Sequence, residues 1–446
     1  MRQVRHVWPD FDTWLEQLED TRYQPFVTYP KQFIMWCGLA MFLCEMGSRR
    51  QIDFDLREIE GFMLDNLNRL TGCKLQTLPV HKTLDHAFGH IGSKQVANVQ
   101  TKAVSKLIRG KMLGDCRLFG WLLIATDGTG HVSFKKRHCP HCLEFHTADG
   151  CSYQHRVLEA KIVSPSGLAI SIASEFIENP SPEGLTSSQY EKLKQDCELK
   201  AFGRLADTLK ARFPHLPICI LGDSLLACGP VIDICQHNHW AYILTFKPGR
   251  TPALWQEFQA LSDQTPQNSL AIQPAEGTRR LYRWVNELPF DDKCGHHHCL
   301  DALLLEETVE GKTTTFSWIT SIRLNPSTVD PVATRGGRTR WKIENQGFNH
   351  QKNSGLNLEH AYSLSQDGLK IFYTLLQIAD MMMQLFCKGN ILGNVARRYG
   401  ATPIKLFGSL KNISRRLLEC LRYFRIPDSA FDTEAARHIQ LRLDTS

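Results

Sequence analysis

The chain has 446 residues, 42% of them hydrophobic, with a formal net charge of +6 and 15 cysteines. This length exceeds what one hydrophobic core normally serves, so two or three packed units are expected. The longest apolar run, residues 33–44, is shorter than the roughly 20 residues of a membrane-crossing helix. Because the cysteines are irregularly spaced and no cleavable leader precedes them, the sequence predicts reduced thiols and a cytoplasmic location.

The first 118 residues predict a helical region, because apolar side chains recur at helical spacing and no strong strand pattern appears. Within it, residues 82–111 contain Asp85 as the only acid among six basic residues. These are Lys82, Lys94, Lys102, Lys106, Arg109 and Lys111. Such a zone suits the phosphate backbone of DNA, although a solvated helix face gives the same charge pattern.

Residues 119–246 predict an α/β core in which a mixed sheet carries helices on its faces. Short apolar runs bounded by turn signals predict its strands, and a stretch rich in charged residues predicts a long helix before the fourth strand. The expected order is strands near 121–130, 156–163 and 168–176, a helix over 187–213, and strands near 218–224 and 240–246.

The remaining sequence divides into three segments. Residues 247–335 predict a β-rich insertion with strands near 303–305 and 313–322. Residues 336–387 return to helical patterns and predict a second part of the core. Residues 388–446 predict a second helical region, whose first part is again strongly basic.

Two aspartates of the predicted core each follow an apolar strand. Asp127 stands in IATDGTG and Asp223 in ICILGDS, so both carboxylates are expected at neighbouring strand ends. Glu344 completes the set from the predicted helix 338–349, with Arg340 one turn earlier. Three carboxylates favour a pair of magnesium or manganese ions, which suit phosphodiester chemistry. Taken singly, each acid is more often a turn residue or part of a surface ion pair.

With these motifs, residues 121–386 resemble the bacterial insertion-sequence transposases of the Asp-Asp-Glu type, which have a ribonuclease H-like core and a β-rich insertion before the Glu. In their signature, two residues separate a Tyr from an Arg, three separate the Arg from the Glu, and six separate the Glu from a Lys. Arg340 and Glu344 keep the central spacing. Gly337 stands at the Tyr position and Lys352 follows Glu344 after seven residues, which are two departures from the pattern.

The resemblance implies metal-dependent cleavage of DNA strands at the ends of a mobile element and transfer of the 3′ hydroxyl to target DNA. It implies catalytic roles for Asp127, Asp223, Glu344, Arg340 and Lys352, the three acids being ligands of magnesium or manganese. It also implies an N-terminal region that recognises terminal inverted repeats, and a homodimer that pairs two ends.

A second metal site is predicted after the first strand. Cys139 and Cys142 form a C-x2-C pair, and His146 and Cys151 follow within a dozen residues. These four side chains could hold zinc tetrahedrally; His155 is nearby but borders a strand. The alternative is a hairpin loop with free thiols.

Further side chains are candidates for contacts to DNA. Trp284 follows Arg283 in the insertion, and an indole can stack on an unpaired base, although core packing is the commoner role. The KCGHHHC segment at residues 293–299 is interpreted as a polar loop. In the N-terminal region the candidates are Lys94, Lys102, Lys106, Arg109 and Lys111.

Two other functions stay open. The same carboxylates would serve a metal-dependent nuclease that cuts DNA without joining it. A non-catalytic DNA-binding protein descended from a transposase would explain the departures from the signature, although all three acids are present.

Overall fold

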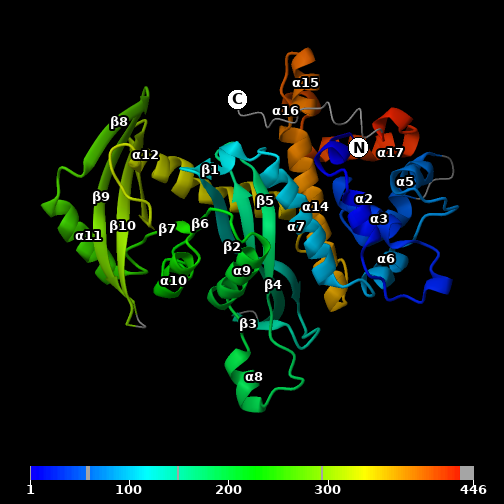
Figure 1. Ribbon diagram of the computed structural model, residues 1–446, viewed down its shortest axis with the longest axis horizontal. Helices are drawn as coiled ribbons and strands as arrows, with labels where there is room; N and C mark the ends of the chain where they lie inside the picture. The colour runs from blue at the N-terminus through cyan, green and yellow to red at the C-terminus, as the bar shows by residue number, and fades with distance from the viewer. Residues whose placement is uncertain (1, 57–60, 148–149, 293–294, 432–446) are drawn as a thin grey trace. The chain divides into compact units, whose positions relative to one another are not determined.

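The computed structural model describes residues 2–56, 61–147, 150–292 and 295–431. The chain forms two compact units. The helical unit comprises Met1–Gly114, Ile170–Ile172 and Phe348–Ser446, and the sheet unit comprises Asp115–Ala169 and Ala173–Gly347. The two terminal helical regions therefore belong to one unit, and the insertion lies in the unit that contains the sheet (Figure 1). None of the helices among the described residues is long and apolar enough to span a bilayer.

The helical unit is built around two apolar helices. Its helices are α1 (Arg2–Val7), α2 (Phe11–Glu16), α3 (Lys31–Leu43), α4 (Ile52–Asp55), α5 (Met63–Thr71), α6 (His81–Phe88), α7 (Ser93–Arg109), α13 (Asn349–Asn353), α14 (Gln366–Lys388), α15 (Asn390–Arg398), α16 (Pro403–Phe407) and α17 (Leu410–Tyr423). α14 packs against α3, α6 and α7. A Cβ atom at Gly38 of α3 would lie 2.8 Å from the side chain of Leu375 of α14, so a larger residue there would force Leu375 to shift.

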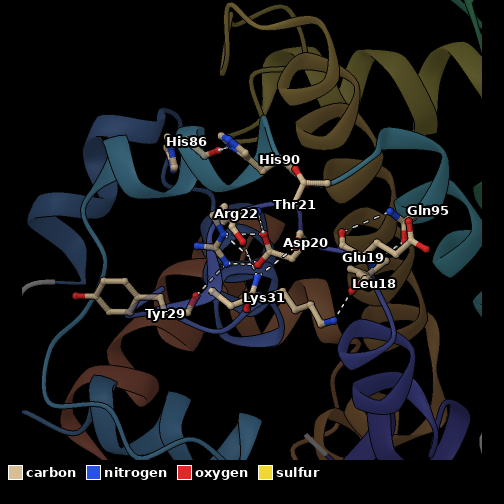
Figure 2. Close-up of polar contacts among 11 residues, drawn as sticks. Leu18, Glu19, Asp20, Thr21, Arg22, Tyr29, Lys31, His86, His90 and Gln95 are labelled. Carbon is tan, nitrogen blue, oxygen red and sulfur yellow. Dashed lines mark hydrogen bonds and ion pairs between the residues drawn. The ribbon is translucent and has the colours of Figure 1, made fainter. Parts of the chain in front are cut away.

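The loop between α2 and α3 is held by a buried ion pair (Figure 2). Arg22 Nη2 donates to Asp20 Oδ2 at 2.6 Å and to the Tyr29 carbonyl at 3.1 Å. The two side chains are only 7% and 5% exposed. Burial alone would raise the pKa of Asp20, but the hydrogen bonds and positive charge of Arg22 hold it below its usual value. The loop geometry therefore depends on an ionised carboxylate.

The sheet unit contains one mixed sheet. Its strands are β1 (Arg117–Leu118), β2 (Trp121–Phe134), β3 (Leu143–Thr147), β4 (Gly150–Val163), β5 (Ala169–Ile177), β6 (Ile218–Gly222), β7 (Ala241–Thr245), β8 (Ser269–Ala275), β9 (Thr278–Asp291), β10 (His297–Val309) and β11 (Lys312–Thr320). Their order is β3-β4-β2-β6-β7-β11-β10-β9-β8, with β1 on β2 and β5 on β4. Only the β2–β6 and β6–β7 pairs are parallel among the pairings described.

Helices flank this sheet. They are α8 (Ser187–Leu193), α9 (Glu198–Arg212), α10 (Gly229–His237), α11 (Pro252–Gln264) and the short α12 (Val329–Pro331). α9 packs on β4, α10 on β7 and α11 on β9. The buried faces consist mainly of β-branched and leucine side chains, as expected for strands covered by helices. The predicted α/β class with a mixed sheet and flanking helices is therefore confirmed.

Several elements differ from the prediction. The helix expected over 187–213 is interrupted between α8 and α9, and Thr186 closes a capping box at the start of α8. β8 and β9 lie in the insertion, where no strands were predicted before residue 303. Both insertion strands that were predicted are present, as β10 and β11. They continue the core sheet, because β11 pairs with β7.

The Asp20–Arg22 pair gives a first prediction. Replacing Arg22 with Gln leaves a buried carboxylate without its cation, and we expect a loss of about 3 kcal/mol in unfolding free energy at pH 7. Because the pKa of Asp20 is lowered, this contribution is present above the usual carboxyl pKa and disappears as the pH falls through the folded value. Urea unfolding measures both effects. Arg50→Gln, at an exposed position of the same unit, is the control; equal losses in the two variants would contradict the argument.

Candidate metal-binding active site

Asp127 lies in the middle of a strand. β2 runs on to Phe134, so the predicted strand end at Asp127 is wrong. What ends there is the parallel pairing with β6, whose last matched pair is Ala125 with Leu221. Asp223 follows directly after β6. Extending the register by two residues would set Asp223 beside Asp127, and the charge of Asp223 raises the pKa of Asp127.

Glu344 and Arg340 come from an irregular helical segment. It consists of a π-helical turn at Val332–Gly336, a 3-10 turn at Gly337–Trp341 and a second π-helical turn at Ile343–Phe348, rather than the regular helix predicted over 338–349. π turns inside helices are frequent at functional sites. Arg340 Nη1 lies 2.8 Å from Glu344 Oε1 and 3.5 Å from Asp127 Oδ2. The guanidinium therefore stands between two of the three predicted carboxylates.

The crowding of charged groups changes the pKa of Asp127. Burial and the negative charges of Glu344, Asp223 and Glu198 together raise its pKa to about 7, against the opposing charge of Arg340. An acid crowded by other acids in this way is a candidate ligand for a divalent cation.

Glu198 is a fourth carboxylate that the sequence analysis missed. It is the first residue of α9, its Oε1 accepts a hydrogen bond from Arg156 at 2.9 Å, and burial together with Asp223 raises its pKa. A Cβ atom at Gly128 would lie 2.2 Å from Glu198 Oε1, so glycine after Asp127 makes room for this side chain. No motif links Glu198 to Asp127 along the chain.

The three acids are not gathered tightly around one point. Glu344 and Asp223 both raise the pKa of Asp127, but among the described residues the three carboxylates are not a group whose ligand atoms all lie within 4.8 Å of one another. In a two-metal site the ions stand about 4 Å apart and the ligands spread around both. A set of acids spread in this way is therefore a candidate two-metal site.

The glycine at the signature's Tyr position has a packing reason. A Cβ atom at Gly337 would lie 2.2 Å from the indole of Trp318, and one at Gly336 would lie 2.3 Å from Ile243. Trp318 is buried in β11 and stacks on Phe316. The segment that carries Arg340 and Glu344 thus lies directly on β7 and β11 through two glycines.

Lys352 and the basic residues predicted to contact DNA near the N-terminus belong to the helical unit. Lys352 belongs to α13 in the helical unit, and its Nζ lies 2.7 Å from Glu359. In that unit Lys94, Lys102 and Arg109 are exposed on α7, and Lys111 follows the helix, also exposed. Lys106 of α7 pairs with Asp10 at 3.1 Å. The basic face of α7 therefore faces solvent and keeps both interpretations open.

Trp284 is buried, only 3% exposed, in β9. A base cannot stack on it without unpacking the sheet, so the predicted DNA contact is replaced by core packing. Its neighbour Arg283 pairs with Glu306 at 3.1 Å. The exposed aromatic near the acids is Trp341, which is 50% exposed, with the Arg340 guanidinium 4.6 Å from its ring centroid. It follows Arg340 directly, but the sequence analysis did not single it out.

The thiols and imidazoles fall into groups other than the predicted one. Cys139 and Cys142 meet His155 rather than His146 and Cys151, which lie with Glu144 in a second group. β3 and β4 pair across this region, which places His146 opposite Cys151 and away from the first two thiols.

The segment interpreted as a polar loop also contributes to a cluster. His296 and His298 meet Asp233 and Asp292, with the ligand atoms within 4.8 Å of one another. The loop residues 293–294, including Cys294, lie outside the described residues. No disulfide joins the cysteines of the described residues.

No protein-family model matches the chain, and no curated protein matches its sequence.

The raised pKa of Asp127 predicts a gain in stability on its replacement. In metal-free protein the folded state loses stability as Asp127 ionises between its ordinary pKa of 3.8 and about 7. The cost is about 1.4 kcal/mol per pKa unit. Asp127→Asn should therefore unfold at a higher temperature than the parent at pH 8, and the gap should close as the pH falls toward 4.

Thermal unfolding in EDTA measures this difference. Asp207→Asn, an exposed acid on α9, should change the midpoint at neither pH. An Asp127→Asn gain that is the same at pH 8 and pH 4 would show that Asp127 titrates normally.

Proposed function

We propose that this chain is a DNA transposase of the Asp-Asp-Glu type, with a ribonuclease H-like core formed by β2, β4, β5, β6 and β7. The observation that supports it most is the meeting of Asp127 with Arg340 and Glu344 from a segment more than 200 positions away in the sequence. Acids from separate strands and a distant helix converge in the order and chemical context that the family resemblance implies.

The chain order of the core supports the same proposal. β2, β4 and β5 come first, α9 follows, and β6, α10 and β7 complete the core, with β6 placed parallel beside β2. The antiparallel strands β8 to β11 are inserted between β7 and the segment that bears Glu344. A β-rich insertion at this point in the chain is what the resemblance implies.

In this proposal Asp127, Asp223 and Glu344 would hold two magnesium or manganese ions. When bound, such ions activate the attacking water or 3′ hydroxyl and stabilise the leaving oxygen. The protein's own part is positional. Backbone N–H groups fix the two aspartates, since Gly128 N donates to Asp127 and Leu225 N donates to Asp223, both at 2.9 Å.

Arg340 would interact with both the carboxylates and the DNA substrate. Its charge holds Asp127 and Glu344 close together before metal binds. Among the described residues, its buried Nε has no hydrogen-bond acceptor, whereas Nη1 pairs with Glu344. A phosphate oxygen of the scissile strand would satisfy Nε, as arginine commonly does for phosphate. Arg340 would thus position the phosphodiester beside the ions.

Loss of a metal ligand gives the main prediction. Asp127→Asn and Glu344→Gln should each abolish manganese-dependent cleavage, with a loss of at least 100-fold, while binding of DNA stays within a few-fold because the basic residues remain. The substrate is a fragment that carries the DNA flanking this reading frame. Asp207→Asn is the control. Cleavage at the parent rate by either variant would refute the proposed roles.

A strand-transfer assay with the same fragments, pre-cut at the 3′ end, distinguishes a transposase from a nuclease. A transposase joins the end to a target plasmid, and the joined product should vanish in Asp127→Asn. Cutting without any joining would favour the nuclease alternative.

Trp341 gives a second prediction for this site. Its exposed ring beside Arg340 can stack on a base next to the scissile phosphate, an interaction of roughly 1 to 3 kcal/mol. Trp341→Ala should weaken the productive complex about 10-fold or more, and Trp341→Phe should restore most of the loss. The measurement is cleavage rate against DNA concentration. An unchanged rate in Trp341→Ala would exclude stacking.

A further inference from the structure

A compact cluster of soft ligands lies in the sheet unit, outside the carboxylate site. Cys142 is fully buried, His155 is 3% exposed, and Cys139 is partly buried beside them. Cys139 Sγ and Cys142 Sγ are 3.6 Å apart, and His155 Nε2 lies 3.3 Å from the first and 3.4 Å from the second. Three potential metal ligands therefore face one point.

We propose that Cys139, Cys142 and His155 bind one zinc ion. Zinc binds cysteine sulfur at about 2.3 Å and histidine nitrogen at about 2.0 Å in a tetrahedron. Those lengths set neighbouring ligand atoms about 3.5 to 3.8 Å apart, close to the spacings found. Among the described residues, the group contains no fourth protein ligand, so a water or an outside ligand completes the tetrahedron.

The histidine is oriented for this role. His155 Nδ1 lies 3.2 Å from Glu178 Oε1. A carboxylate there accepts a hydrogen bond from Nδ1–H, which leaves the lone pair of Nε2 directed at the two sulfurs. Histidines that bind zinc usually donate their other ring N–H to such a partner. The Glu178 contact thus selects the tautomer that a metal requires.

The next residue braces the C-x2-C turn. Asn179 donates its side-chain amide to the Cys142 carbonyl at 2.7 Å and its backbone N–H to the His141 carbonyl at 3.0 Å. His141 Nδ1 in turn contacts the Asn179 carbonyl at 2.8 Å. Consecutive residues after β5 therefore hold the histidine and the thiol turn, and the ion would tie this turn to β4, which pairs with β2.

This proposal is independent of the proposed transposase activity. Zinc would stabilise the end of the β2–β4 pairing, where His155 lies opposite Val132, five residues beyond Asp127. It also differs from the site predicted from sequence, since His146 and Cys151 are not ligands.

The test is the metal content of the purified full-length chain. We expect one zinc per chain by elemental analysis, lost in Cys139→Ser and in the double variant Cys139→Ser, Cys142→Ser. Glu178→Gln should keep the ligands but weaken zinc affinity 10-fold to 100-fold in a chelator competition. His146→Ala and Cys151→Ser, the sequence-predicted ligands, should retain zinc at the parent level and serve as matched controls.

Two further measurements keep the outcome unambiguous. Cobalt added to the metal-free parent should give a thiolate-to-cobalt charge-transfer band, which needs no variant to fold. His298→Ala tests whether the ion belongs instead to the group of Asp233, Asp292, His296 and His298. The proposal is overturned if the parent takes up no zinc, if Cys139 and Cys142 form a disulfide in its place, or if His298→Ala alone removes the metal.

Discussion

The arrangement of the sheet unit depends on one buried guanidinium. Arg340 is 6% exposed in its side chain and lies between Asp127 and Glu344. Around it, Asp223 and Glu198 add negative charge, and Arg156 offsets only Glu198. Four carboxylates against two guanidiniums leave two negative charges when all are ionised, an imbalance that a bound divalent cation would offset.

Packing of the segment 332–348 on the sheet positions Arg340 between Asp127 and Glu344. Gly336 and Gly337 let the helical segment lie on Ile243 and Trp318, and the π turns shift the following residues so that Glu344 faces Arg340. The insertion matters for the same reason, because Trp318 belongs to its last strand and pairs with Thr245 of β7. The strands of the insertion thus form the surface against which the Glu344 segment packs.

Much of the core could be predicted from sequence, because apolar strands and acidic turns leave local patterns. The strands β6 and β7 and the position of Asp223 directly after β6 followed from such patterns. Glu198 and Trp341 could not be found this way, since each becomes relevant only through neighbours far away in the chain. His155 was near the predicted zinc cluster, but local spacing favoured His146 and Cys151, which the β3–β4 register turns away.

Trp284 shows the opposite error. Its flanking arginines indicated a DNA contact, yet period-two alternation in β9 places the indole in the core and leaves Arg283 to pair with Glu306. From the sequence, Gly337 was only a departure from the Tyr of the signature. In the structure, the indole of Trp318 leaves no room for a side chain at this position. In both cases the deciding neighbour is on another strand.

The central claim is that residues around 127, 223 and 344 surround one pair of divalent ions. Iron-mediated cleavage of the protein backbone tests it directly: ferrous ion replaces the native metal, and ascorbate with peroxide then cuts the chain beside the bound ion. The account predicts fragments ending near all three positions, suppressed together by excess magnesium or manganese. Cuts confined to other segments, such as those near Asp233 and His298, would contradict it.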